Sequence, residues 1–406
     1  MSEYLRLGPD ATSTEKDKPS MSTQHASSTT GSGSPFWNAA DDTTIDRIQA
    51  QLVTVPLGAA RGGSGATQLQ LVHLTVTDSD GAEGTGFTFS LGSGAEAVLA
   101  MLEAVHASAV ATLPLWQWDR TWYQLRASTH RLGIGVTQLA TSAVDIAVWD
   151  LRARRAGLPL HRLLGSRRDT IPIYGSGRAT HAMSTEELAV GAQAYVDEGY
   201  TAIKLRAGFH SPARDVARTA AVRDAVGPDV SIMIDCNERL DLATAQWLAV
   251  RLADLDVYWL EEPLPAGDIA GHRALADRSA VPLAVGEHLL GLAAFVPYAG
   301  TAGVFQPDVP LTGGVSEFLR IAALAEAHGV AISPHFLPEF HVQLAAAATT
   351  TTWVEHFPLL DDLLTDVLHP HDGVVDVPAT PGHGMAWNED ALARYTTGRL
   401  DTGRSA

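Results

Sequence analysis

Three acidic residues, Asp235, Glu261 and Glu287, each stand at the end of a short apolar run. The runs recur about one strand-helix repeat apart, so parallel strands would bring these side chains to one edge. Three crowded carboxylates repel one another strongly where the dielectric is low, and a divalent cation removes that repulsion. An oxygen-only ligand set with room for water favours Mg²⁺ over zinc. Together the residues predict a magnesium site, although any one alone would fit a salt bridge or a helix cap better than a metal ligand.

Two basic residues, Lys204 and Arg206, end another apolar run. Alternate residues of a strand face the same side, so both cations should point into the same site while Leu205 turns outward. There they suit an anionic substrate or enolate, and the alternative is that they only neutralise the acidic residues. We assign Lys204 to catalysis and Arg206, with Asn237, to substrate binding.

A carboxylate and an imidazole, Asp308 and His335, end two further runs that follow one another in the chain. The carboxylate can hold one ring nitrogen and fix the tautomer, which leaves the other nitrogen as a general base. A lone histidine is more often structural, but this spacing favours a catalytic dyad. Glu355 ends the last run and could cap a helix or pair with a cation. Cys236 is the only cysteine and is expected to be an inert core thiol.

These residues can act together only in a fold that brings the ends of their strands close to one another. Short apolar strands alternate with amphipathic helices beyond residue 170, which predicts a parallel (β/α)₈ barrel of the TIM type. Periodicity alone would also allow an open doubly wound sheet. The expected strands are Ile171 to Tyr174, Ala202 to Arg206, Ser231 to Asn237, Val257 to Glu262, Leu283 to Glu287, Val304 to Asp308, Ala331 to His335 and Trp353 to Glu355.

The region before the barrel has a different pattern. Alternating strands from about Ile45, a turn at Asp80-Gly81 and two helical stretches, 94–110 and 139–156, predict an α+β domain. Gly58 to Gly65 is a glycine-rich loop. We therefore divide the chain into a disordered tail (1–44), an N-terminal α+β capping domain (45–168), a barrel (169–370) and a C-terminal segment (371–406) that returns to the first domain.

Composition restricts the partners. The chain has 406 residues, of which 46% are apolar and 18% charged, with a formal net charge of -18. Such a charge repels nucleic acid and anionic lipid, and no apolar run is long enough for a membrane span. Neither a signal peptide nor a possible intramolecular disulfide is found, so a cytoplasmic location is expected.

The combined motifs resemble the mandelate racemase subgroup of the enolase superfamily, in order and in phase. The resemblance extends upstream to the segment Ala143 to Asp150 and downstream to Pro381-Gly382-His383-Gly384, so it covers nearly everything after Ile45. The motifs that carry it are Lys204-Leu205-Arg206, Asp235-Cys236-Asn237, Glu261-Glu262-Pro263, Gly286-Glu287-His288, Gln306-Pro307-Asp308, Ser333-Pro334-His335 and Glu355.

This resemblance implies a fold, a cofactor and a set of roles. The capping domain would close over the barrel mouth, with Gly58 to Gly65 as the substrate-covering loop. Asp235, Glu261 and Glu287 would bind Mg²⁺, and His335 with Asp308 would abstract the proton α to a carboxylate. Glu355 would hydrogen-bond the substrate carboxylate as it becomes an enediolate. Relatives are commonly homo-oligomers, so the same is expected here.

One departure concerns Arg206, where the subgroup typically has a lysine that acts as a second base. A guanidinium remains protonated and accepts protons poorly, which argues against two-base racemisation. The hypothesis is therefore a lyase, an aldonate or aldarate dehydratase that makes a 2-keto-3-deoxy acid from a sugar acid. The alternatives are a racemase or epimerase of a 2-hydroxy acid, a cycloisomerase of a muconate-like lactone, and a noncatalytic metal-binding barrel.

Overall fold

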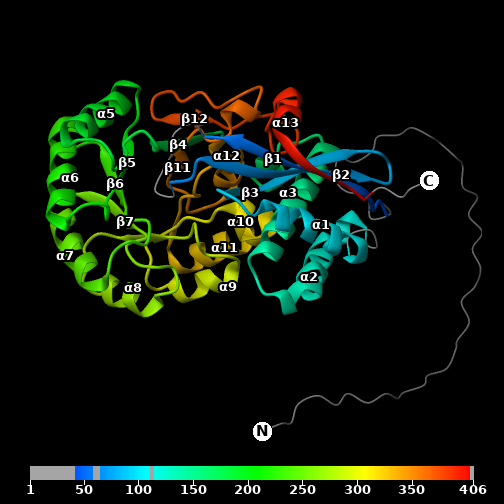
Figure 1. Cartoon of the computed structure of the whole chain (residues 1–406), viewed down its shortest axis with the longest axis horizontal. Helices are drawn as coiled ribbons and strands as arrows, with labels where there is room; N and C mark the ends of the chain where they lie inside the picture. The colour runs from blue at the N-terminus through cyan, green and yellow to red at the C-terminus, as the bar shows by residue number, and fades with distance from the viewer. Residues whose placement is uncertain (1–41, 58–64, 110–113, 403–406) are drawn as a thin grey trace, which may run out of the picture. The chain divides into compact units, whose positions relative to one another are not determined.

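The computed structural model describes residues 42–57, 65–109 and 114–402, excluding the side chains of residues 105–109. Most of the predicted tail and nearly all of the predicted substrate-covering loop, Gly58 to Gly65, therefore lie outside the described residues. The described chain forms a parallel barrel and an α+β layer, and the α+β layer is built from elements that come before and after the barrel (Figure 1). Within these described ranges, no helix is long and apolar enough to cross a membrane.

The α+β layer is a four-stranded antiparallel sheet packed on helices. Its strands lie in the order β13-β1-β2-β3, so the last strand of the chain pairs with the first. The sheet register places Val53 opposite Leu71 and Leu71 opposite Phe89, and all three are buried. The elements are β1 (Ile45–Pro56), β2 (Gln68–Asp78), β3 (Glu83–Leu91), α1 (Ala95–Ala109), α2 (Trp118–Thr129), α3 (Val136–Arg155), α4 (Leu160–Leu163), α13 (Glu389–Tyr395) and β13 (Thr396–Asp401).

The barrel has eight parallel strands in sequence order, β4 to β11. Strand β11 returns to pair with β4, and a bridge between Ile332 and Thr351 joins β10 to the segment before β11. The predicted (β/α)₈ barrel is therefore confirmed over the open sheet. Its strands are β4 (Thr170–Gly175), β5 (Ala202–Arg206), β6 (Ser231–Asp235), β7 (Val257–Glu261), β8 (Leu283–Val285), β9 (Val304–Phe305), β10 (Ala331–Ile332) and β11 (Val354–His356).

Helices surround these strands because each strand presents alternate apolar residues to the outside. Ile203, Leu205 and Ile234 pack against helices, whereas Tyr174, Met233 and Trp259 fill the barrel interior. Ser184 begins α5 with a capping box, and Ser211 caps α6 ahead of Pro212. The helices are α5 (Thr185–Asp197), α6 (Pro212–Val226), α7 (Leu242–Ala253), α8 (Ile269–Ala276), α9 (Leu292–Phe295), α10 (Val309–Thr312), α11 (Gly314–His328) and α12 (Pro338–Ala347).

Several strands end earlier than the sequence predicts. The predicted strand to Asn237 stops at Asp235, and the predicted strand to Glu287 stops at Val285. Asn237 has a φ of 44° and Gly286 a φ of 154°, so the backbone turns away from the extended form where the polar residues begin. The candidate site residues thus lie partly on tight turns beyond the strands.

The two layers are joined through buried polar contacts of α3. The Asp145 carboxylate accepts hydrogen bonds from the Trp118 indole at 2.7 Å and from the Ser316 backbone at 2.8 Å and hydroxyl at 2.6 Å. Burial raises the pKa of Asp145 to about 6 although these donors oppose the change. The C-terminal segment also contacts both layers, since β12 (Val374–Asp376) pairs with β4 and β13 with β1. Helix α3 therefore sets the position of the chain that follows Asp308.

The contact between α3 and β3 depends on glycine. A Cβ at Gly86 would meet the backbone of Ala143 and Ala147 and lie 2.9 Å from the Ala147 Cβ. We expect Gly86→Ala to lower the free energy of unfolding by about 1–3 kcal/mol, because this helix cannot retreat without repacking. Gly191→Ala is the control, since Gly191 lies within α5 with nothing within 4 Å of its added Cβ, and should stabilise by about 0.4–1 kcal/mol. Chemical denaturation measures both variants, and equal effects would show that the close approach at Gly86 is not needed for stability.

Candidate active site

The three carboxylates predicted to bind metal converge at the barrel mouth. Asp235 and Glu261 end β6 and β7, and Glu287 follows β8 by two residues. Each offers one oxygen, and these oxygens lie within 4.8 Å of one another. Asp235 and Glu261 have no exposed surface, and the side chain of Glu287 is 12% exposed. The predicted spacing therefore corresponds to a real cluster of oxygen ligands.

The electrostatics of this cluster call for a cation. Burial, with repulsion from Asp235, raises the pKa of Glu261 to about 8 although Lys204 opposes the change. Burial and repulsion from Glu262 likewise raise the pKa of Glu287 well above its ordinary value. The Trp259 indole and the Gln306 amide donate to Glu261 Oε2 at 3.0 and 2.8 Å, which orients that carboxylate from behind. A hard divalent cation fits this oxygen-only donor set.

Lys204 lies among carboxylates, which fits the alternative that it neutralises the acidic residues. Its ammonium nitrogen is 2.7 Å from Glu261 Oε1, 2.8 Å from Glu355 Oε1 and 3.7 Å from Asp235 Oδ2. Burial lowers the pKa of Lys204, but Glu261 and Glu355 more than offset it, so the pKa lies well above its ordinary value. Lys204 is therefore a fixed cation beside the cluster.

Arg206 is held by protein groups. Its guanidinium pairs with Asp235 and donates to Asn237 Oδ1 at 2.7 Å, and Asn237 also donates its backbone N–H to Asp235 Oδ1 at 2.8 Å. Burial lowers the pKa of Arg206, but Asp235 and Glu287 more than offset it, so the side chain remains protonated. Arg206 and Asn237 thus form one network with Asp235.

The imidazole of His335 lies between two carboxylates. Its Nδ1 is 3.0 Å from Asp308 Oδ2, and its Nε2 is 3.3 Å from Glu287 Oε2. The ring stacks on Phe336 with centroids 3.8 Å apart. Burial lowers the pKa of His335 well below its ordinary value, although Glu355 acts in the opposite direction, so the ring is neutral and can accept a proton. The dyad therefore directs Nε2 toward the carboxylate cluster.

Glu355 connects Lys204 to the turn after His335. Its Oε2 accepts the Phe336 backbone N–H at 3.0 Å, and Phe336 and Leu337 have φ values of 55° and 48°. Burial alone would raise the pKa of Glu355, but Lys204 and then His335 lower it to about 2. Glu355 therefore accepts hydrogen bonds from protein groups in this structure, and its predicted hydrogen bond to a substrate carboxylate stays a prediction.

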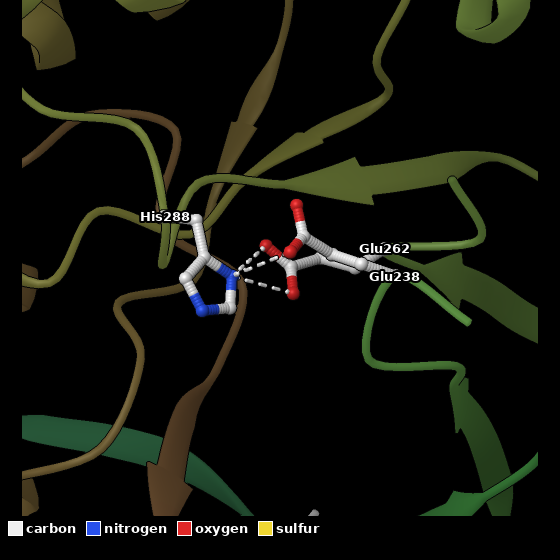
Figure 2. A group of neighbouring side chains, drawn as sticks. All are labelled: Glu238, Glu262 and His288. Atoms are coloured by element: carbon white, nitrogen blue, oxygen red, sulfur yellow. Dashed lines mark hydrogen bonds and ion pairs between the residues drawn. The ribbon is translucent and has the colours of Figure 1, made fainter. Parts of the chain in front are cut away.

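The structure brings every predicted site residue into one network, and it adds residues that sequence reasoning did not assign. Trp259 and Gln306 stand two residues before Glu261 and Asp308, so the two-residue period of a strand would have indicated them. A second group, Glu238, Glu262 and His288, lies in the turns just beyond the candidate metal ligands (Figure 2). Cys236 is buried against the helices, as expected for an inert core thiol.

Comparisons with known proteins agree with this geometry. Residues 43–165 match the family described as mandelate racemase / muconate lactonizing enzyme, N-terminal domain, and residues 187–391 match the enolase C-terminal domain-like family. The chain is 34% identical over 334 residues to L-talarate/galactarate dehydratase of Salmonella typhimurium, covering 80% of this chain and 82% of that protein. It is 31% identical to 3,6-anhydro-alpha-L-galactonate cycloisomerase of Streptomyces coelicolor, covering 87% of this chain and 100% of that protein.

A solved structure shows the same architecture. L-talarate dehydratase from Polaromonas sp. JS666, complexed with Mg and L-glucarate, is 33% identical, with a TM-score of 0.83 over 89% of this chain and 99% of that chain. An eight-stranded parallel barrel joined to an N-terminal α+β layer defines the enolase-type barrel class. The chain belongs to the enolase superfamily and, within it, to the mandelate racemase subgroup.

The pairing of Lys204 with buried carboxylates has a measurable consequence. We expect Lys204→Met to lower the free energy of unfolding in magnesium-free buffer by about 3–5 kcal/mol, because Glu261 and Glu355 lose their shared cation. The double variant Lys204→Met with Glu355→Gln should recover part of this loss, since one unpaired charge is removed. Chemical denaturation measures each variant. A single variant within about 1 kcal/mol of wild type, on the order of one ordinary hydrogen bond, would show that the pairing is not needed.

Proposed function

We propose that this protein is a Mg²⁺-dependent acid-sugar dehydratase that abstracts the proton α to a carboxylate and eliminates the β-hydroxyl as water. One observation carries the proposal: His335, backed by Asp308, directs Nε2 to within 3.3 Å of Glu287 in a three-carboxylate cluster. A base facing a cation site is what this chemistry requires. The dehydratase relatives that act on talarate and galactarate support the choice of substrate class.

The protein residues have separable parts in this reaction. When bound by Asp235, Glu261 and Glu287, Mg²⁺ would supply positive charge for the substrate carboxylate as it gains a second negative charge. Lys204 provides further positive charge beside the same cluster, and Glu355 holds it there at 2.8 Å. We propose that Glu355 acts mainly by positioning Lys204 and the turn after His335. The neutral His335 accepts the α-proton at Nε2 while Asp308 stabilises the resulting imidazolium through Nδ1.

Whether the intermediate is reprotonated or loses its β-hydroxyl depends on whether Arg206 can act as a second base. Arg206 is protonated and engaged by Asp235 and Asn237, so it is a poor candidate for a second base. The imidazolium of His335 can instead return its proton to the β-hydroxyl. The Cβ–O bond then breaks, water leaves, and the enol rearranges to a 2-keto-3-deoxy acid. This balance favours elimination over racemisation.

A substrate panel tests the proposal directly. With Mg²⁺ and a set of aldonates and aldarates that includes galactarate, L-talarate and L-glucarate, we expect at least one acid to give a 2-keto acid detectable as its semicarbazone. Chelation should abolish turnover, and added Mg²⁺ should restore it. Proton NMR in heavy water distinguishes a dehydratase from a racemase, since a racemase exchanges the α-proton of the acid without loss of its hydroxyl. Absence of 2-keto acid from every member, despite demonstrated Mg²⁺ binding, would refute the proposal.

A second prediction concerns the base. His335→Asn should reduce kcat at least about a hundredfold, the range expected for loss of a general base, while leaving the thermal unfolding transition close to that of wild type. His328→Asn is a matched control because His328 is exposed in the last turn of α11. Initial rates of 2-keto acid formation measure both. Full activity in the His335 variant would remove this residue from the proposed role.

A further inference from the structure

A second imidazole-carboxylate pair lies beside the candidate active site. His288 directly follows Glu287, and its Nδ1 is 2.9 and 3.0 Å from the two oxygens of Glu262 (Figure 2). Glu238 Oε2 is 4.0 Å from the same nitrogen. The Glu262 side chain is 3% exposed, whereas that of His288 is 51% exposed. One edge of the ring is therefore held by buried acid while the other reaches solvent.

The local backbone holds Glu238 and Glu262 in the positions from which they face the His288 ring. Glu238 and Glu262 have φ values of 61° and 39°, in the left-handed region, and the Glu238 backbone N–H donates to the Glu262 carbonyl at 2.8 Å. The Ala266 backbone N–H donates to the Glu238 carboxylate. Strained positions persist only where surrounding contacts hold them. The two carboxylates are thus fixed supports for the His288 ring.

The ring of His288 lies beside the same site as His335. His288 Nδ1 is 3.9 Å from Glu287 Oε1, and the other oxygen of Glu287 is 3.3 Å from His335 Nε2. His288 is also close enough to affect the pKa of both His335 and Asp308. Among the described residues, His288 Nε2 has no hydrogen-bond partner, and it points away from both supporting carboxylates (Figure 2). The half-exposed His288 side chain therefore has one ring nitrogen without a protein partner in the described part of the chain, next to the proposed cation site.

We infer that His288 is a further substrate-contacting residue, whose Nε2 hydrogen-bonds a hydroxyl oxygen of the sugar acid beyond its carboxylate. This inference rests on the proposed function and deepens it, because it assigns a residue that selects polyhydroxy acids over simple 2-hydroxy acids. A hydroxyl can donate or accept, so it complements Nε2 in either ring form. A site built to hydrogen-bond a hydroxyl discriminates strongly against substrates that lack it.

The side chains of Glu238, Glu262 and His288 are close enough together to hold a metal ion. However, Nδ1 already faces both oxygens of Glu262 at hydrogen-bond distance, so the nitrogen that an ion would need serves as a donor. The ring is therefore assigned to the substrate, and the stoichiometry of ion binding becomes part of the test.

Two substitutions test the two ring nitrogens of His288 separately. In His288→Asn the amide lies near the former Nδ1 and can still contact Glu262, but nothing replaces Nε2. In His288→Gln the amide reaches near the former Nε2, but the Glu262 contact is lost. We expect Asn to lower kcat/KM for the best sugar acid about tenfold to hundredfold, as for one lost substrate hydrogen bond, and Gln to retain more activity than Asn. Isothermal titration should show one Mg²⁺ per chain, with affinity in the Asn variant within about threefold of wild type.

The outcomes are distinct. A purely supporting role would reverse the order, with Asn near wild type and Gln impaired, and would overturn the inference. Loss of Mg²⁺ affinity in the Asn variant, or a second bound ion that disappears with it, would also overturn it. A wild-type protein that converts no sugar acid refutes the proposed function and this assignment together, whereas an active wild type with the reversed order removes only His288.

Discussion

The site is dominated by the cost of burying like charges together. Asp235, Glu261 and Glu287 place oxygens within 4.8 Å of one another at the barrel mouth, and Glu355 lies on the far side of Lys204. Buried carboxylates this close together are stable only if cations are held beside them. Lys204 and Arg206 supply part of this compensation from alternate positions on β5, and a bound divalent ion would supply the rest. The strands and turns around the site hold these charged side chains in place.

The barrel meets that demand through strand order and turns. Consecutive parallel strands bring β5, β6 and β7 side by side, so Arg206 pairs in register with Asp235, and Asp235 with Glu261. Beyond the strand ends, left-handed residues such as Asn237, Glu262 and Phe336 redirect the chain. Glu355 stabilises one of these turns through the Phe336 N–H at 3.0 Å. Backbone strain at the mouth is thus offset by hydrogen bonds that the charged residues accept from these turns.

The α+β layer contributes through its packing on the barrel. Helix α3 inserts Asp145 against the start of α11, and Gln138 donates to the Thr312 carbonyl at 2.6 Å. The short helix α10 between Asp308 and Gly313 is therefore held from the capping side. Because Asp308 contacts His335 Nδ1 at 3.0 Å, packing from the α+β layer also helps to position the proposed base.

The sequence by itself determined the fold class, the family and the set of candidate residues. Strand-helix repeats and their polar endings are local patterns, so Asp235, Glu261, Glu287 and the Asp308–His335 pair could be predicted to converge. Only the tertiary structure decided which charges pair. Lys204 contacts both Glu261 and Glu355, Glu355 accepts the backbone N–H of Phe336, and His288 contacts Glu262 through one ring nitrogen. A strand's period specifies which way a side chain faces, whereas its partner depends on barrel closure and on turns that no single segment encodes.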